Sequence, residues 1–181
     1  MLLTALSALA GAAWVAHRPV TVPTGVAVKK GNKHRDLVDD LKQTAIKGSG
    51  VFEISEAELN RHLEKVLAAK IQVPLNRWVR FESLSMELEA EVAHLTIVWD
   101  ISGHRSTATV DLSVKRLEKI FRVEVVGGAY GHLKVPRGLL RPLYPALRGL
   151  SEVLQEEIQA LFQMNQVRVA VDKLVLDTRF P

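Results

Sequence analysis

The fold is decided by residues 84–101, which read LSMELEAEVAHLTIVWDI. Apolar side chains alternate with polar ones along this stretch, and a period of two is that of a strand with one buried face. The same alternation returns over 108–114 and 121–125. Four successive amphipathic strands joined by short polar turns predict an antiparallel meander with one apolar face. That face must be covered by another layer.

The cover is expected from the C-terminal part of the chain. Apolar residues recur at helical spacing over 147–162, and Pro145 suits the first turn of one long helix. Residues 167–176 then predict a closing strand, whose alternation slips between Val171 and Leu174 as it would at a β-bulge. These elements predict an α+β fold.

Shorter elements precede the sheet. Residues 33–47 carry apolar side chains at helical spacing and end in Gly-Ser-Gly, which predicts a short amphipathic helix. After a brief strand over 51–54, Ser55 and Glu58 have the Ser-x-x-Glu spacing of a capping box, in which each side chain satisfies a free backbone amide of the other residue. A second helix is therefore expected to start there and to end near Lys70, which completes a short N-terminal helical pair.

Composition limits the class of protein. The chain has 181 residues, 48% of them hydrophobic, with no cysteine and a formal net charge of +4. Such a chain can bury a core, which excludes intrinsic disorder and a disulfide-stapled miniprotein, and we expect residues 33–181 to form a single domain. A basic cluster at Lys134, Arg137, Arg141 and Arg148 has no accompanying nucleic-acid motif. A solvated face is therefore favoured over a patch for nucleic acid or anionic headgroups.

An uncharged apolar run occupies residues 1–16. As a helix it would be about 24 Å long, short of the roughly 30 Å of a hydrocarbon core, but it fits a signal anchor or a signal peptide, and Trp14 suits the membrane interface. A buried N-terminal helix is the alternative. The nearest positive charges, from Arg18 onward, follow the run, which by the positive-inside rule alone would put the domain in the cytoplasm. Residues 17–32 are expected to be a linker.

The sequence predicts no catalytic residue, metal ligand or cofactor site. The six histidines have no zinc-ligand spacing, and residues 48–50 lack the frame of a nucleophile elbow or a phosphate loop. His62 and His94 are expected to be solvated or locally hydrogen-bonded. Glu89 and Asp100 are expected to belong to the polar face of the sheet. The protein is therefore not expected to be an enzyme.

An apolar sheet face under a helix can close into a packed core, or it can leave a lengthwise groove that admits an acyl chain. Periodicity is identical in the two cases, so both stay open. The groove, if formed, is expected to be lined by the bulky inward residues of both layers. These are Ile97, Trp99, Ala108, Val110 and Val123 from the sheet and Leu154, Ile158, Leu161 and Phe162 from the helix.

Two segments resemble a known family. Residues 54–60, ISEAELN, are similar to the opening helix of the YpmS-like proteins, which are small bacterial envelope proteins with an N-terminal apolar anchor. Residues 131–136, GHLKVP, are similar to that family's Gly-x-Leu-x-Val-Pro segment, which precedes a long helix and a last valine-rich strand. The resemblance covers roughly residues 50–176. It extends to YceB-type proteins, whose lipobox cysteine this chain lacks.

The resemblance implies a tubular lipid-binding-like fold, in which a strongly twisted sheet wraps a long helix. It implies a protein anchored through residues 1–16 at the extracytoplasmic, periplasmic face of the inner membrane, with a lipid or other hydrophobic ligand. It supplies no catalytic residues. The alternative is a non-enzymatic structural or docking subunit of an envelope or secretion complex. Its protein partner would contact Trp78, Val79 and Phe81 and the basic cluster near Arg137.

Overall fold

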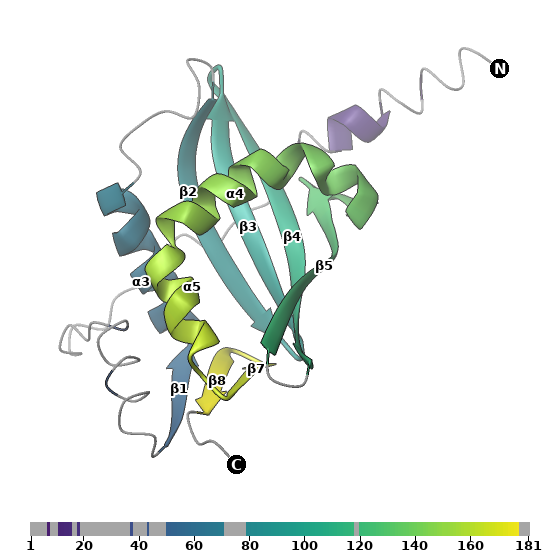
Figure 1. Ribbon diagram of the computed structural model, residues 1–181. Helices are drawn as coiled ribbons and strands as arrows, with labels where there is room; N and C mark the ends of the chain where they lie inside the picture. Colours follow the sequence, from purple (N-terminus) through teal and green to yellow (C-terminus); the bar gives the residue numbers. More distant parts are fainter. Residues whose placement is uncertain are drawn as a thin grey trace.

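The computed structural model describes residues 7, 11–15, 18, 37, 43, 50–70, 79–117 and 120–177. The described chain combines antiparallel sheets with helices, so the expected α+β class is confirmed (Figure 1). In chain order the elements are β1 (Val51–Ser55), α3 (Glu56–Lys70), β2 (Val79–Glu89), β3 (Val92–Ile101), β4 (His104–Leu117), β5 (Ile120–Tyr130), β6 (Leu133–Pro136), the 3-10 helix η1 (Arg137–Leu143), α4 (Tyr144–Val153), α5 (Gln155–Phe162), β7 (Gln166–Ala170) and β8 (Lys173–Asp177).

The predicted meander is the larger sheet, with five strands in the order β2-β3-β4-β5-β6 and antiparallel pairing throughout. Its turns are tight. Between β3 and β4 only Ser102 and Gly103 intervene, and their φ angles of 55° and 87° are those of a type I′ hairpin turn. This turn fixes the register that sets Ile97 opposite Ala108, so the apolar residues of both strands share one face.

A second, three-stranded sheet has the order β1-β8-β7. The prediction of one closing strand with a bulge over 167–176 is wrong, because β7 and β8 form a hairpin around a turn at residues 171–172. Asp172 has a φ angle of 59°, as a tight turn requires. The slip in alternation therefore marks a chain reversal.

The apolar face of the larger sheet is crossed by α4 and flanked by α5 (Figure 1). The expectation of one long helix is wrong: α4 has 10 residues and α5 has 8. They meet at Leu154, where φ is −96° and ψ is 21°. Shortly before, Ser151 Oγ donates to the carbonyl of Arg148 at 2.7 Å, a local bond of the kind that bends helices. Pro145 lies in the first turn of α4, as predicted.

The buried apolar residues form two clusters. One joins the centre of the larger sheet to α3, η1 and α4 and includes the fully buried Ile97 and Leu140. The other lies between the small sheet and the ends of β2 and β3 and includes Leu176. Met86 and Leu112 pack against both clusters, so the two sheets share one continuous core.

Helix α3 closes the outer edge of β2. Its capping box forms as predicted, with Ser55 Oγ donating to Glu58 Oε2 at 2.8 Å and the amide of Glu58 donating to Ser55 Oγ at 3.3 Å. Farther along the helix, Asn60 Nδ2 donates to the Met86 carbonyl at 2.7 Å, while Asn60 Oδ1 accepts from the Met86 amide at 2.6 Å. The Leu88 amide donates to Glu56 Oε2 at 2.8 Å. Side chains thus take the place of a neighbouring strand.

The N-terminal expectations fall mostly outside the described residues: the anchor over 1–16, the linker over 17–32 and the helix over 33–47. In the described part of the chain, no helix is both long enough and apolar enough to cross a membrane. Residues 11–15 are helical, and the Val15 carbonyl accepts from the His132 amide at 3.5 Å. This short helix therefore lies beside the turn between β5 and β6 (Figure 1).

We expect Asn60→Asp to lower the free energy of unfolding by about 1–3 kcal/mol, because it removes the donor to the Met86 carbonyl and sets a negative charge against it. The control is Arg61→Ala, at the exposed next position, for which a change within about 0.5 kcal/mol is expected. Urea unfolding followed by circular dichroism measures both. If Asn60→Asp were as stable as the parent protein, the bonds of Asn60 would not hold α3 against the edge of β2.

Candidate functional site

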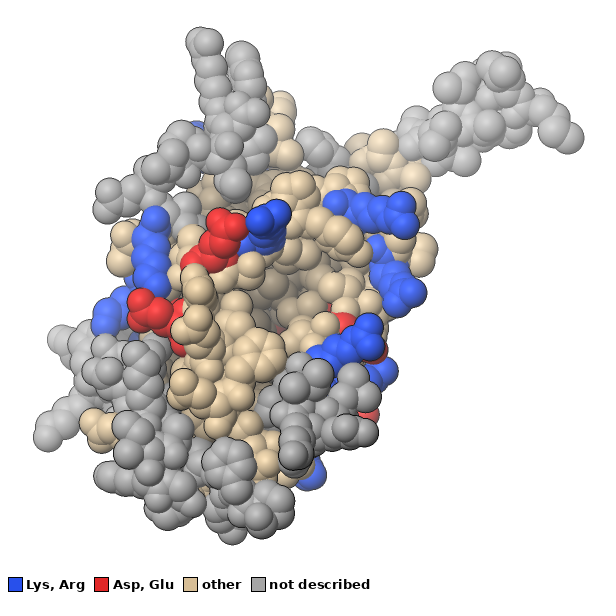
Figure 2. All heavy atoms as spheres, in the orientation of Figure 1, with Lys and Arg blue, Asp and Glu red and all other residues tan. Residues whose placement is uncertain are grey.

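The surface is hollowed between α4, α5 and β5 (Figure 2), over the part of the sheet formed by β3 and β4 (Figure 1). Among the described residues, those that line this hollow in Figure 2 are mainly uncharged, whereas charged side chains stand around its rim. An uncharged depression with a charged rim suits a ligand with an apolar body. We refer to it as the hollow.

Four of the nine residues predicted for a groove belong to the packed core beneath this face. Ile97, Trp99, Ala108 and Val110 are all buried and lie in the cluster that also contains Leu140. Their side chains contact other core residues and leave little surface for a ligand. At the centre of the sheet the structure therefore has the closed core, one of the two arrangements that the sequence left open.

The other five lie where the helix layer separates from the sheet. Val123 and Phe162 are 52% and 53% exposed, and Leu154, Ile158 and Leu161 are half-buried. Because the chain bends at Leu154, α5 diverges from β5 (Figure 1) and leaves inward-facing side chains near the ends of β4 and β5 less covered. The structure thus brings the predicted residues to one side of the molecule, at two different depths.

Sequence reasoning missed three residues of this region. Leu112, Val114 and Val125 are half-buried and pack at the margin of the core clusters, and Val114 is the register partner of Val123. The alternation of apolar and polar residues could have identified them, because all three lie on the inward phase of β4 and β5. The difference between a core position and a wall position depends on where the helix bends.

Beside the hollow, the ends of β4 and β5 carry a basic group, in which Lys115 and Arg122 are register partners on the phase opposite to Val114 and Val123. Lys115 Nζ and Arg122 Nε lie 3.0 and 3.3 Å from the carboxylate of Glu124. The hydrogen bond and charge of Lys115, with further contributions from Arg122 and Arg137, hold the pKa of Glu124 below its ordinary value. One carboxylate therefore faces three cations, which leaves this part of β5 positive.

The opposite face of the larger sheet carries a polar cluster. His94 Nδ1 lies 2.7 Å from Asp111 Oδ1, and His94 Nε2 lies 3.5 Å from Glu89 Oε2. Burial by itself lowers the pKa of His94, but the hydrogen bonds and charges of Asp111 and Glu89 outweigh it and raise that pKa above 6.5. The expectation of a locally hydrogen-bonded His94 is confirmed. Over the described residues, no group of three or more His, Asp or Glu could hold a metal ion.

His62 is also bonded within the protein, although it lies far from His94. Its Nε2 lies 3.3 Å from Glu157 Oε1, and this contact joins α3 to α5. Both side chains are largely buried. The pair fixes the position of α5 on the side away from β5, and so helps to hold the hollow open.

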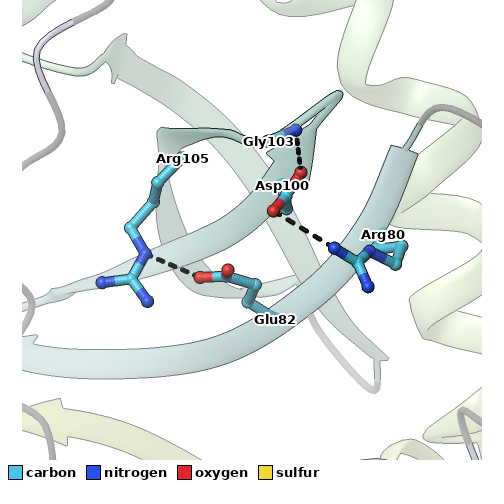
Figure 3. A network of polar contacts seen from close by, with 5 residues as sticks. All are labelled: Arg80, Glu82, Asp100, Gly103 and Arg105. Atoms are coloured by element: carbon cyan, nitrogen blue, oxygen red, sulfur yellow. Dashed lines mark hydrogen bonds and ion pairs between the residues drawn. The ribbon is translucent and has the colours of Figure 1, made fainter.

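A third set of polar residues closes the end of the β2–β3–β4 meander (Figure 3). Arg80 pairs with Asp100 at 3.4 Å, Arg105 with Glu82 at 2.7 Å, and the Gly103 amide donates to Asp100 Oδ1 at 2.6 Å. These carboxylates are engaged in holding three strands and a turn in register. Asp100 therefore has a structural role on the polar face.

Comparison with protein-family models, with characterised proteins and with solved structures finds no match to this chain. The resemblance to the YpmS-like proteins stays a prediction.

We expect the contribution of His94 to stability to depend on pH. Because the pKa of His94 is raised in the folded protein, its contribution is fully present below the unfolded value of about 6.5 and is lost as pH rises through the folded value. His94→Gln should therefore destabilise the protein more at pH 5.5 than at pH 8.5, as measured by urea unfolding. Asp111→Asn, which removes the main carboxylate partner of His94, should also destabilise the protein more at pH 5.5 than at pH 8.5. If the loss of stability were independent of pH for both variants, this prediction would be wrong.

Proposed function

We propose that this chain is a membrane-anchored envelope protein that binds a lipid or another hydrophobic ligand in the hollow. The observation that carries the proposal is the exposure of Val123 and Phe162, two large apolar side chains on β5 and α5, the elements that border the hollow. Burying a side chain of this kind is worth about 1.5–3 kcal/mol. An acyl chain lying between them would recover that free energy.

The rim supports an amphiphilic ligand. Apolar side chains line the opening, whereas Lys115 on β4 and Arg122 on β5 stand near its edge. A lipid in this position buries its hydrocarbon against the apolar walls and keeps its polar end in water beside these cations. The rest of the proposal follows the family resemblance: residues 1–16 hold the chain at the extracytoplasmic face of the inner membrane, and the bent sheet and helices belong to a tubular lipid-binding-like fold.

The docking alternative has less support. Phe81, one of the residues expected to contact a protein partner, is half-buried and packs against the core cluster. Trp78 lies outside the described residues, and for Val79 only the strand position is described. An envelope complex without a ligand therefore remains an outcome of the tests that follow.

The direct test is to identify what the protein carries. The full chain, extracted from its own membrane in mild detergent, is expected to retain lipid on native mass spectrometry. Phe162→Asp should lower the amount of bound lipid at least several-fold, because a carboxylate in the apolar wall must be desolvated when the ligand binds. Val171→Asp is the matched control, since Val171 is exposed in the turn between β7 and β8. Equal lipid in both variants, or none in the parent, would refute the proposal.

A second test separates wall from core. Val123→Phe should change the free energy of unfolding by less than about 1 kcal/mol, because its side chain is half exposed and has room to grow, yet it should reduce bound lipid. Ala108→Phe enlarges a buried side chain between Ile97 and Tyr130 and should cost about 1–3 kcal/mol or more. Thermal unfolding and lipid content are measured for both. A large loss of stability in Val123→Phe would mean that the wall is closed.

A further inference from the structure

A face built by η1 and the start of α4 has an unusual charge composition. Residues 125–151 contain no Asp or Glu, yet they carry the exposed cations Lys134, Arg137, Arg141 and Arg148. Arg148 pairs with Glu152, while among the described residues no carboxylate lies within ion-pair distance of the other three. Figure 2 shows basic side chains at the upper right of the molecule with no acidic ones beside them. Among the described residues, Glu124 interacts with the charge of Arg137 but is shared with Lys115 and Arg122, so the face has a net positive charge.

The same face exposes large apolar side chains. In a 3-10 helix, residues three apart lie in one row. Leu140 and Leu143 lie in the buried row of η1, and Leu139 and Arg141 belong to the two other rows, which face outward. Leu139 is 59% exposed, and Tyr144, the residue that follows η1, is 48% exposed. Apolar and cationic side chains are thus interleaved on the outside of η1.

The N-terminal helix adjoins this face. The Val15 carbonyl accepts from the His132 amide in the turn between β5 and β6, and Tyr130, at the end of β5, donates its hydroxyl to the carbonyl of Leu139 at 3.0 Å. Residues 11–15 and η1 therefore flank one turn, as Figure 1 shows. Trp14 is 61% exposed, with the Arg18 guanidinium 3.7 Å from its ring centre.

We propose that this η1 face, made of Trp14, Arg18, Lys134, Arg137, Leu139, Arg141 and Tyr144, docks onto an anionic phospholipid surface. Trp and Tyr side chains are amphipathic and are enriched at the level of the headgroups, and Lys and Arg near such a surface are attracted by its negative potential. Exposed apolar residues that gather on one face, rather than being scattered singly, are typical of an interaction surface. The apolar run of residues 1–16 leads into the same face, so both contacts can be made to one bilayer.

The inference concerns the outside of the domain and does not depend on a ligand in the hollow. It does determine how the domain is oriented, because the η1 face directs the end of the sheet formed by β5 and β6 toward the lipid. It also replaces the solvated basic face expected from the sequence with a face that binds headgroup phosphates.

The test uses the absence of cysteine from the chain. Full-length protein carrying Leu139→Cys is labelled with an environment-sensitive fluorophore and mixed with vesicles of phosphatidylcholine, with or without phosphatidylglycerol. On vesicles containing phosphatidylglycerol, we expect a blue shift and protection from an aqueous quencher. The matched label position is Val171→Cys, which is similarly exposed in the turn between β7 and β8 and should stay in water.

Charge is tested by reversing two cations in the labelled background. Arg137→Glu with Arg141→Glu should lower the ratio of docked to undocked label by at least about ten-fold, since each basic residue near an anionic surface contributes several-fold to binding. Arg61→Glu with Arg168→Glu makes the same change in net charge at exposed positions on α3 and β7 and should leave the ratio unchanged.

Three results would overturn the proposal. The label at Leu139→Cys could stay in water while the chain sediments with the vesicles. The shift could be equal on pure phosphatidylcholine, or it could survive the double charge reversal at Arg137 and Arg141. None of these readouts measures lipid in the hollow, so failure here and failure of the proposed function are distinguishable.

Discussion

The fold depends on which groups form hydrogen bonds with the backbone at the outer edge of β2. An edge strand exposes backbone amides and carbonyls that must find partners, and here Asn60 bonds both groups of Met86 while Glu56 accepts from the amide of Leu88. The carbonyl of Leu88 is met by the amide of Asp172, from the turn of the other sheet. A single helix and a single hairpin turn therefore complete the larger sheet and join it to the smaller one.

This constraint gives a role to most residues of the segment 54–60. Ile54 is buried in the second core cluster, and Ser55 and Glu58 cap the helix. Glu56 and Asn60 then reach the edge strand. A capping box alone determines where a helix begins but not where the helix packs. Glu56 and Asn60 add bonds to the backbone of β2, and these place the helix along the edge of that strand. The short motif that carries the family resemblance is thus also the one that joins α3 to both sheets.

The larger sheet could be predicted because the alternation of apolar and polar residues is a local property of each strand. The tight turns then fix the register in which neighbouring strands pair. The hairpin of β7 and β8 was not predicted, because Asp172 is the single turn-favouring residue between its strands and no Gly, Asn or Pro accompanies it. The bend at Leu154 was missed for a related reason: its nearest cause is the hydroxyl of Ser151, which reads as an ordinary exposed helix residue.

The candidate site was predicted only in part, because exposure is not a local property. Val110 and Val123 occupy the same inward phase of neighbouring strands, yet the first is fully buried and the second is half exposed. The difference comes from α5, which turns away from β5 and is held toward α3 by the contact between His62 and Glu157. No pattern within one strand can report where a helix that lies elsewhere in the sequence will bend.

Strand β5 connects the hollow to the η1 face, and its two ends are packed differently. Near its C-terminal end it pairs with β6, and at Gly128 an added Cβ would collide with the Thr109 carbonyl and lie only 3.0 Å from a Leu140 methyl group. η1 is therefore seated directly on the backbone of β5, with no room for adjustment. Near the other end, β5 pairs only with β4 among the described strands, and Val123 is exposed there. A surface that docks through η1 is thus tightly coupled to the sheet, while the side of the hollow opposite α5 is formed by a part of β5 that has a strand partner on one side only among the described strands.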